Sequence, residues 1–526
     1  MLTANRRGSS ERGTILILVI VLVLTISLIV AGAVSTSFHQ GRNTQYSLAQ
    51  TSALSLAESV TETAQKNMLT QVANYETPTL SGSLTMGGTP YDYTIEPVGV
   101  QIQRADVDGV TMTIQPYRIR SSVEVDRGGA TVHRIVELTM TPIFQYMIFY
   151  RDDLEILPGP SMTLGGRVHS NGSIYVGCGN TLTVNSDYFR CTGKILRERK
   201  NDGSATGGTV NIKEYQDTSY TNMTASMDAD NPDWTNLALN TWHGTVMDGS
   251  HAVNEVAAPS IASIKAFPSP GVKGYFHEHA DLVVVDGVAY DRTGTVLTLP
   301  AGTVTQRTMY DGRENRNVTV SEINVGLLNS SGAFPANGLI YAYRTDASAA
   351  QPNGIRLTNA TEILAPMTVV SEDPVYVHGN FNTVNKKGAA VIADAVNLLS
   401  QNWNDTKTAT SGLPSAAPTT YNLAMVTGIV PTPDGGGSYS GGFENLPRFH
   451  ENWSGVSSTI NGAFINLFDS EIGRAPWMYG GRAYTAPIRN WAFDPMLQDI
   501  DNMPPFTPNA VYFRRVVWDD AVPLPF

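Results

Sequence analysis

The chain contains few charged residues and only two cysteines. Asp, Glu, Lys and Arg make up 16% of its 526 residues, below the roughly 25% that is typical of soluble domains. Acidic residues outnumber basic ones, and the net charge is −12. Because duplex binding requires a basic footprint, nucleic acid is not an expected partner. The abundant Gly, Thr, Ser and Asn are typical of turn-rich β-structure, which is common in secreted and surface proteins.

Charge is absent altogether from the stretch between Thr14 and Phe38, which follows Arg6, Arg7 and Arg12. A bilayer is crossed by about 20 apolar residues in a helix. Positive charge stays on the cytoplasmic side, so we expect a cytoplasmic N-terminus and an exported remainder. A cleavable secretory signal ending near Ala31–Ala33 is the alternative interpretation.

Glycine and proline are also absent from residues 42–77. Apolar or small residues recur there at the three-to-four spacing of a helical stripe. The stripe consists of Tyr46, Ala49, Ala53, Leu56, Val60, Ala64, Met68 and Val72. The pattern predicts that one transmembrane and amphipathic helix covers 14–77, with bends at Gly32 and Gly41. The alternative is a membrane anchor followed by a separate soluble helix, joined near Gly41.

This N-terminal segment resembles that of type IV pilin-like proteins, and most of all the PilX-type minor pilins. The resemblance rests on a basic start, Arg12-Gly13, the apolar helix, and a stripe containing Leu56-Ala57-Glu58. It implies that 1–13 is a cytoplasmic leader and that a prepilin peptidase cuts between Gly13 and Thr14. Most major pilins carry glutamate at the fifth mature position, where this chain has Leu18. Some minor pilins and the K-type pseudopilin share that departure, which favours a minor or tip component.

Residues 78–150 change to an alternating pattern that predicts antiparallel strands. Asp126-Arg127-Gly128-Gly129 predicts a hairpin, and Asp108-Gly109 marks an earlier one. A helix followed by an antiparallel sheet is the arrangement that the pilin resemblance implies. We expect the sheet to bury one face on the helix stripe.

Residues 151–410 contain short β runs separated by Gly and Asn corners. This spacing suits an irregular β-helix or β-solenoid, with a sandwich as the alternative. The polar span 197–263 is expected to be a large insertion. Residues 389–400, which are apolar and contain few helix breakers, are predicted to form a helix that caps or braces the β-core. The fold class is therefore mainly β with a long N-terminal α-helix.

Residues 411–526 are rich in aromatic side chains, which serve a binding surface and a β core about equally well. This region, together with the segments Val168–Gly172 and Asn382–Lys387, resembles large β-rich bacterial extracytoplasmic proteins that also carry PilX-type N-termini. With these parts included, the resemblance spans most of the chain. It implies a shared architecture and no particular activity.

The two cysteines, Cys178 and Cys191, lie close in sequence in a region expected to be exported. A disulfide between them is the predicted state, because an oxidising compartment favours it. Two thiolates alone are not a zinc set.

Four polar groups are candidates for chemistry, and for each the simpler interpretation is structural. His277-Glu278-His279 with Asp281 offers metal ligands but lacks a helical His-Glu-x-x-His spacing, so a solvated turn is favoured. Asp228–Asp233 lacks the EF-hand spacing and is interpreted as a loop. His169-Ser170-Asn171 has no nucleophile elbow around it. Asp152, Asp153 and Glu155 form a possible acid cluster of the kind that β-helix carbohydrate enzymes use.

The sequence therefore predicts a structural minor pilin-like component of a type IV pilus or type II secretion-like filament. The expected location is a bacterial inner membrane crossed once, with the body periplasmic or extracellular. Other pilin-like subunits are the expected partners of the helix, with a surface glycan or protein as a further ligand. No enzymatic activity, cofactor or metal is expected. The alternatives are a surface adhesin or glycan-binding module, and a membrane-anchored β-helix enzyme acting on polysaccharide.

Overall fold

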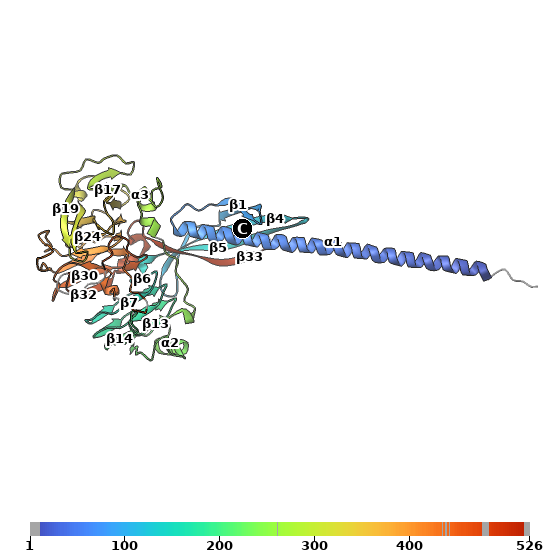
Figure 1. Ribbon diagram of the computed structural model, residues 1–526, viewed down its shortest axis with the longest axis horizontal. Helices are drawn as coiled ribbons and strands as arrows, with labels where there is room; N and C mark the ends of the chain where they lie inside the picture. The colour runs from blue at the N-terminus through green and yellow to red at the C-terminus, as the bar shows by residue number, and fades with distance from the viewer. Residues whose placement is uncertain are drawn as a thin grey trace, which may run out of the picture.

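A computed structural model describes residues 11–259, 261–433, 435–436, 439–440, 442–475 and 483–519. The first ten residues, with most of the predicted leader, therefore lie outside the described part. The chain forms two parts, an antiparallel module that carries the long helix and a parallel β-solenoid body (Figure 1). The predicted fold class is confirmed.

The long helix α1 (Glu11–Ala73) is continuous through Gly32 and Gly41. Its 63 residues correspond to a length of about 95 Å. The interpretation with a separate soluble helix is therefore wrong. Figure 1 shows the helix extending away from the body, with the antiparallel sheet along only its C-terminal half. α1 ends before Tyr75, which adopts a left-handed conformation.

The module sheet has the strand order β1-β2-β4-β5-β33, with β3 also paired to β4. The predicted hairpins are confirmed, because Val125 pairs with Gly128 and Ala105 with Thr111. Alternate residues of β4 and β5 face α1 and pack on Val60, Ala64 and Met68. The strands are β1 (Ser81–Met86), β2 (Thr89–Pro97), β3 (Ile102–Ala105), β4 (Thr111–Val125), β5 (Gly128–Pro142) and β33 (Asn509–Asp519).

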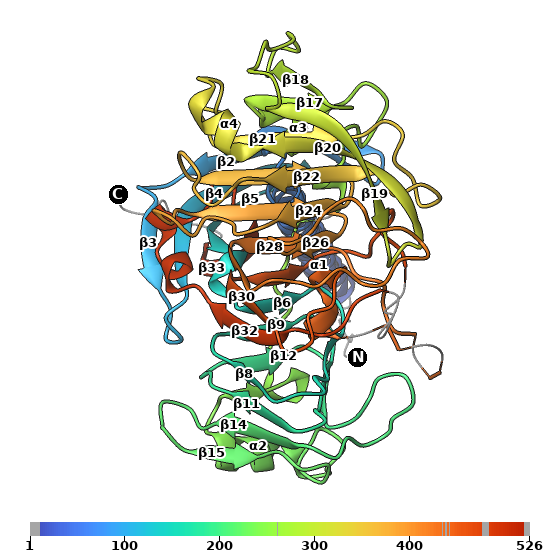
Figure 2. The same cartoon turned by 90° about the vertical axis from the view of Figure 1, so that its left-hand side faces the viewer.

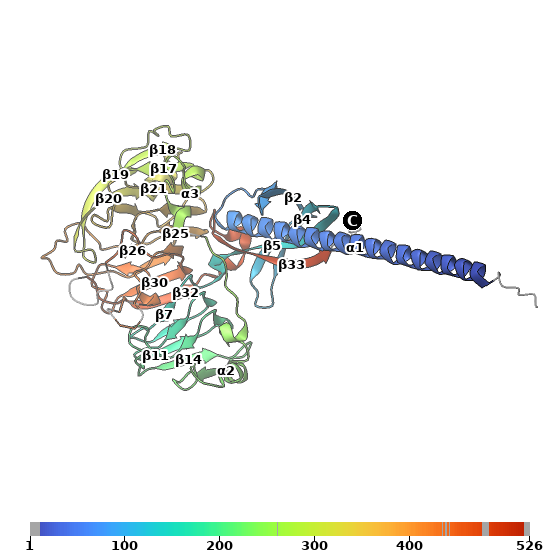
Figure 3. The same ribbon diagram turned by 45° about the vertical axis from the view of Figure 1, so that its right-hand side comes forward.

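The whole body is inserted between β5 and β33. These two strands pair antiparallel from Pro142 with Asn509 onward, and residues 143–508 lie between them in sequence (Figure 3). The predicted aromatic-rich region 411–526 is thus divided between the two parts. β27–β32 continue the body, and β33 completes the module sheet.

The body has three faces, of which the first is an eleven-stranded sheet. Its strands pair in parallel except for the terminal hairpin β17–β18. In spatial order they are β16 (Val246–Met247), β12 (Phe189–Cys191), β9 (Val168–Ser170), β6 (Ile148–Tyr150), β31 (Phe464–Asn466), β28 (Ala424–Thr427), β25 (Ala389–Ala393), β23 (Met367–Ser371), β21 (Leu339–Tyr343), β17 (Leu282–Val285) and β18 (Val288–Asp291).

The second and third faces are each made of two shorter sheets. The second comprises β13 (Ile195–Leu196), β10 (Ile174–Val176), β7 (Leu154–Ile156) and then β19 (Val304–Asp311), β20 (Arg316–Asn324), β22 (Gly354–Thr358), β24 (Val375–His378), β26 (Val396–Leu399) and β29 (Arg448–Phe449). The third comprises β15 (Tyr220–Asn222), β14 (Thr209–Lys213), β11 (Thr181–Val184), β8 (Met162–Leu164) and then β27 (Thr419–Asn422), β30 (Ser457–Gly462) and β32 (Ile488–Phe493).

The order of the rungs in space differs from their order in sequence. The N-terminal rungs run from β6 to β16 toward one end of the body, where α2 (Trp234–Trp242) lies (Figure 2). The chain then crosses to the opposite end at β17 and winds back until β31 pairs in parallel with β6. One continuous solenoid is therefore assembled from two halves, the N-terminal half (148–247) and the C-terminal half (282–493), joined between β6 and β31.

Two sequence expectations for the body need correction. Residues 389–400 form strands β25 and β26 instead of a capping helix. Both faces of these strands are buried, so their sequence reads as a continuous apolar run, which cannot be distinguished from a buried helix by periodicity. The polar span 197–263 is not simply an insertion, because β14 within it pairs with β11 as part of a rung.

Candidate functional site

The N-terminal half of α1 presents an unbroken apolar surface. Large apolar side chains from Ile15 to Phe38 are 47–71% exposed, and the helix is long and apolar enough to cross a membrane. Its two threonine hydroxyls after Thr14 are satisfied within the helix. Thr25 Oγ1 donates to the Val21 carbonyl at 2.9 Å, and Thr36 Oγ1 donates to the Gly32 carbonyl at 2.8 Å. This surface is therefore compatible with lipid or with other apolar helices.

Leu18 belongs to this surface and is 66% exposed. Gly13 and Thr14 lie in the first turns of α1. Processing between these two residues stays a prediction, because nothing in the geometry of the helix tests it.

The C-terminal half of α1 is held against the module sheet by small residues. Ala53, Ala57 and Ala64 are at most 1% exposed, and the helix backbone approaches β5 closely at Gly128. A Cβ atom at Gly128 would lie 2.4 Å from the backbone nitrogen of Gln50. The sequence stripe predicted this face, except that Ala57 takes the buried position expected for Leu56. Tyr46, the first residue of the predicted stripe, is 56% exposed.

The module is joined to the body through the turn between β3 and β4. The Asp108 carboxylate pairs with Arg190 at 2.9 Å, and its backbone carbonyl accepts from Arg167 at 2.7 Å. The side-chain amide of Gln145 contacts the backbone of Thr111 in both directions. The module is therefore joined to the body here by a largely buried ion pair and by hydrogen bonds to the backbone.

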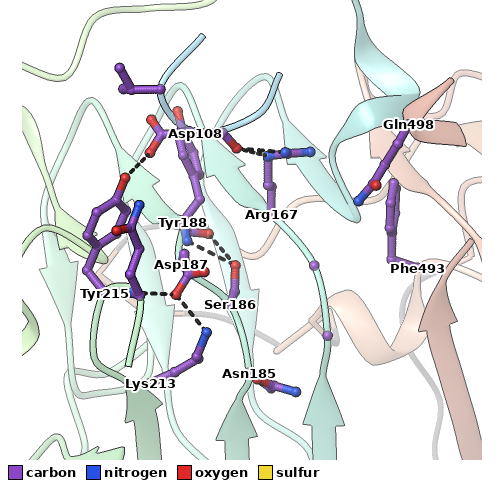
Figure 4. A pocket seen from close by; sticks show the side chains of 14 residues that line it. Asp108, Arg167, Asn185, Ser186, Asp187, Tyr188, Lys213, Tyr215, Phe493 and Gln498 are labelled. Carbon is purple, nitrogen blue, oxygen red and sulfur yellow. Dashed lines mark hydrogen bonds and ion pairs between the residues drawn. The ribbon is translucent and has the colours of Figure 1, made fainter. Parts of the chain in front are cut away.

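A cavity of about 290 Å³ lies beside this junction (Figure 4). Asp187 accepts from Lys213 Nζ at 2.8 Å and from the backbone of Gln216 at 3.0 Å. Burial raises the pKa of Tyr188 to about 12, so its hydroxyl stays neutral. In Figure 4 Asp187 is paired with Lys213, and Arg167 donates to the Asp108 backbone carbonyl. The cavity is therefore a polar seam between the two parts.

Tyr75, which follows the C-terminal end of α1, makes a second contact between the module and the body. Its ring stacks on Tyr275 with centroids 4.3 Å apart, and it meets Phe276 edge-on at 5.5 Å. Tyr275 and Phe276 belong to α3 (Tyr275–His279). The end of the long helix is thus anchored by aromatic contacts.

The segment His169-Ser170-Asn171 is structural. His169 is fully buried in β9, and its Nε2 lies 3.0 Å from Asn171 Oδ1, which is only an acceptor. The proton is therefore on Nε2, and Nδ1 accepts from Tyr188 at 3.1 Å. Burial lowers the pKa of His169 to about 4. Asn171 also exchanges two hydrogen bonds with the backbone of Val256, which fixes the segment that crosses between the two halves.

The His277–Asp281 group is not a solvated turn as predicted. His277 is buried in α3, donates from Nδ1 to the Ala266 carbonyl at 2.9 Å and stacks on Tyr341. Burial lowers its pKa. Asp281 instead accepts from the backbone of Asn337. Across the described residues, no cluster of three or more His, Cys, Asp or Glu is arranged to hold a metal ion.

The acidic stretch Asp228–Asp233 is a loop, as predicted. Asp228 accepts from the backbone of Arg197 at 3.0 Å, and Asp230 pairs with Lys194 at 2.8 Å on the surface. These carboxylates therefore order the chain before α2.

The predicted disulfide is not formed. Cys178 and Cys191 are both free and buried. The Cys178 thiol donates to the Thr209 carbonyl at 3.1 Å, whereas Cys191 ends β12 on the first face. The two residues occupy different positions of the solenoid turn, so their closeness in sequence does not bring the sulfur atoms together.

Most of the described C-terminal aromatic side chains pack in the core, whereas Tyr512 of β33 is 40% exposed. Trp453 is fully buried and meets Phe449 edge-on at 5.3 Å. Trp491 stacks on Phe464 at 5.4 Å and meets Phe443 at 5.5 Å. Trp477 and Tyr479 lie outside the described residues. The cluster therefore supports the join between the two halves, where β31 and β6 meet.

The acid cluster Asp152, Asp153 and Glu155 lines a second cavity of about 180 Å³ together with Lys200 and Asp469. Lys200 pairs with Asp153 at 2.9 Å, and Arg151 pairs with Asp152. Burial raises the pKa of Glu155 to about 7. The sequence located the first three residues, but it did not predict Asp469, which the pairing of the two halves brings to the same place.

Sequence reasoning also missed a polar groove of about 530 Å³ on the second face. Arg356 lies at its base, donating to Glu322 at 2.7 Å and to Asp405 at 2.6 Å. His378 lies beside them, and burial lowers its pKa. These residues are far apart in sequence and have no shared motif, so no local signal identifies the groove.

A buried polar cluster at the tip of the β19–β20 hairpin was also not predicted. Tyr376 donates to Asp311 at 2.6 Å, and Arg448 pairs with Glu314 at 2.5 Å. Burial lowers the pKa of His450, which contacts Asn397 at 2.9 Å, to about 4. The cluster docks the tip of the hairpin on β24 and β29.

No protein-family model matches this chain, and no curated protein matches it. Among solved structures, it is similar to the crystal structure of the competence-associated pilin ComZ from Thermus thermophilus, with 9% sequence identity and a TM-score of 0.23. The match covers 90% of this chain and 97% of that chain. A TM-score this low does not establish a shared fold, so nothing about the function of this chain follows from it.

Proposed function

We propose that this protein is a structural, minor pilin-like component of a type IV pilus or type II secretion-like filament. The observation that carries the proposal is the division of α1. Its first half is exposed and apolar, while its second half holds a module into which a large solenoid is inserted. In this proposal the exposed half lies first in the inner membrane, with the N-terminus cytoplasmic, and then packs against other pilin-like helices.

The position of the body favours a minor or tip component. The solenoid is far wider than the helix that carries it (Figure 1), and a subunit of this shape would crowd its neighbours at every position of a thin filament. Leu18 supports the same assignment, since it places an aliphatic side chain where the repeating subunits of pili carry glutamate.

N-terminal sequencing of the membrane-extracted protein tests the proposal. We expect a mature N-terminus at Thr14 in cells that contain a prepilin peptidase and an intact leader in cells that lack it. Gly13→Val should abolish the cut, whereas Gly8→Val, a matched glycine in the leader, should leave it unchanged. A cut near Ala33, or a leader retained in both strains, would refute the pilin route.

A surface adhesin or glycan-binding module is the second candidate, and the polar groove on the second face favours it. The groove is lined by amide, hydroxyl and charged side chains, which are the donors and acceptors that sugar hydroxyls need. Glycan-array binding by the full chain in detergent tests this function. Arg307→Ala, which removes an exposed side chain of the groove, should reduce binding at least several-fold, while Arg292→Ala outside the groove should not.

An enzymatic function is not part of the proposal, because assembly and display require no turnover. The competing hypothesis, a polysaccharide-active enzyme, would use the acid cluster. Incubation of the full chain with polysaccharides should release no new reducing ends. Release that disappears in Glu155→Gln, Asp152→Asn and Asp153→Asn would overturn this part of the proposal.

A further inference from the structure

The 180 Å³ cavity lies at the join between the two halves of the body. The N-terminal half contributes Tyr150 from β6, Glu155 from β7 and the nearby Lys200. The C-terminal half contributes Thr432 and Asp469. On the second face the ladder is interrupted here, because the short 3₁₀ turn η4 (Phe443–Asn445) lies against β7 in place of a strand. The cavity thus occupies a gap in the sheet.

Two polar atoms of the cavity lining are buried without a partner among the described residues. They are the Tyr150 hydroxyl and the Glu155 Oε2 atom. Tyr150 is 2% exposed and Glu155 is 7% exposed. Leaving a buried polar group unsatisfied costs about 1–3 kcal/mol, and such groups in native structures call for an explanation. Both residues line the same small cavity, so a ligand in it lies beside both side chains.

The charges around the cavity point to a positively charged ligand. Asp152 and Asp153 are neutralised by Arg151 and Lys200, respectively. Among the described residues, no ion pair is formed by Glu155 or Asp469, although the nearby Lys200 favours the charged form of both. Carboxylates left in this state attract a group that carries positive charge and donates hydrogen bonds.

The size of the cavity, and the absence of a metal-ligand cluster among the described residues, narrow the chemical class of the ligand. A cavity of about 180 Å³ holds much more than one water, whose share of liquid volume is about 30 Å³. None of the described carboxylates here forms part of a three-ligand metal group. The Tyr150 hydroxyl both donates and accepts, and the paired carboxylates keep free lone pairs for hydroxyl donors.

We propose that this cavity binds a small hydroxylated primary amine, of which an amino sugar is the simplest example, and that the bound amine bridges the two halves of the solenoid. The ammonium group lies between Glu155 and Asp469, and the hydroxyl groups bind Tyr150, Asp152 and Asp153. The inference stands apart from the pilin assignment, since it concerns only the body.

The ionisation of Glu155 gives the site a pH dependence. Burial raises the pKa of Glu155 to about 7, while Thr432 and Lys200 favour its charged form and Glu444 and Asp153 oppose it. Tyr150 stays neutral, because burial raises its pKa. Asp469 faces Arg151, Asp152 and Lys200, and burial raises its pKa as well. An amine therefore binds more weakly below pH 7, where Glu155 is protonated.

Titration calorimetry on the full chain in detergent tests the proposal with glucosamine as the probe. We expect glucosamine to bind at pH 8 and to raise the thermal unfolding midpoint, and we expect glucose, its neutral analogue, to do neither. Glu155→Gln should weaken binding at least tenfold, and Tyr150→Phe should weaken it several-fold. The matched variants Glu124→Gln and Tyr220→Phe, both at exposed positions of other strands, should bind like the wild-type chain.

Three results would each overturn the proposal. The first is no glucosamine binding by a wild-type chain that unfolds cooperatively. The second is binding that Glu155→Gln leaves unchanged. The third is a calcium chloride titration that saturates this site while glucosamine does not, which would assign the cavity to a metal ion. Far-UV circular dichroism of each variant separates lost binding from lost folding.

Discussion

The antiparallel module and the parallel body differ in how many of their sheet faces are buried. Strands β4 and β5 cover α1 with one face, so buried residues such as Val123 and Val132 alternate with more exposed ones. The body strands β23 and β25 are buried at every position. Alternation therefore specifies register in the module, whereas in the body register depends on the neighbouring rungs and corners.

The two parts also differ in which elements come closest together within each part. Among the glycines, the least space for a side chain in the module is at Gly128, against the helix. In the body it is at Gly462, between successive rungs. The comparison teaches that the module depends on a helix–sheet interface, while the body depends on the stacking of turns. Each prediction below weakens one of these contacts or the junction between the two parts.

The largest effect is expected at Gly462, the last residue of β30. A Cβ atom there would lie 1.8 Å from the Leu423 carbonyl oxygen, so the rungs must separate. Gly462→Ala should lower the free energy of unfolding by about 4 kcal/mol, measured by urea unfolding with tryptophan fluorescence. Gly159→Ala, where a Cβ atom meets nothing within 4 Å, is the control. Equal stability of the two variants would show that rung spacing is adjustable.

Glu155 should make the body less stable as the pH rises. Its pKa is raised from 4.5 to about 7 by burial, so between these pH values the folded state binds one more proton than the unfolded state. The associated stability is complete below pH 4.5 and lost above pH 7, a change of about 3 kcal/mol. Glu155→Gln should therefore be more stable than wild type at pH 8, and the advantage should disappear at pH 4.5. Denaturant unfolding without added amine measures the stability of both chains. A difference in stability that is the same at both pH values would contradict the raised pKa of Glu155.

The helix–sheet contact of the module is tested at Gly128. Because a Cβ atom would lie 2.4 Å from the Gln50 nitrogen, Gly128→Ala should move α1 off the sheet and cost about 2 kcal/mol. At the adjacent Gly129, the nearest atom is 3.7 Å away, and Gly129→Ala is the matched control. Hydrogen exchange should show lost protection in β4 and β5, with the rungs of the body unaffected. Loss of protection throughout would mean that the two parts unfold together.

The junction between the two parts is tested by Asp108→Asn. This change removes the charge that pairs with the largely buried Arg190, and we expect a cost of about 2 kcal/mol. Asp230→Asn breaks the exposed pair with Lys194 and should cost less than about 1 kcal/mol. Limited proteolysis near residue 143 provides a second readout, since a loosened junction exposes the connection. A stable, protease-resistant Asp108→Asn chain would show that the junction is held without this ion pair, by contacts such as those of Tyr75 and Gln145.

The smallest effect is expected from reduction. Cys178 and Cys191 are free, so dithiothreitol should leave the thermal unfolding midpoint unchanged. Thiol labelling in denaturant without reductant should find both thiols. An unfolding midpoint that depends on reductant, or fewer than two labelled thiols, would show that Cys178 and Cys191 form a disulfide.

Much of the module could be predicted from its sequence. The stripe from Ala49 to Met68 and the turns at Asp108-Gly109 and Asp126-Arg127 are local signals. The structure confirms them, with Ala57 buried in place of Leu56. In the body, the hairpin at Asp286-Gly287 is equally local. The prediction of a helix over 389–400 was wrong, because burial on both faces removes the alternation that marks a strand.

The candidate sites of the body were predicted only in part. Asp152, Asp153 and Glu155 are neighbours in sequence, but Asp469 joins them only because β31 pairs with β6. The groove around Arg356 is likewise assembled from several rungs.

The sequence by itself determined the exposed apolar half of α1, its packed half, and the short strands and turns, because these features depend on residues close together in the chain. Only the tertiary structure decided the rest. It inserts the body between the paired strands β5 and β33, and it stacks the C-terminal half of the solenoid on the first rung of the N-terminal half. It also keeps Cys178 and Cys191 apart. The physical reason is that parallel rungs pair through backbone hydrogen bonds and buried aliphatic contacts, which are nearly the same at every rung and carry little sequence information.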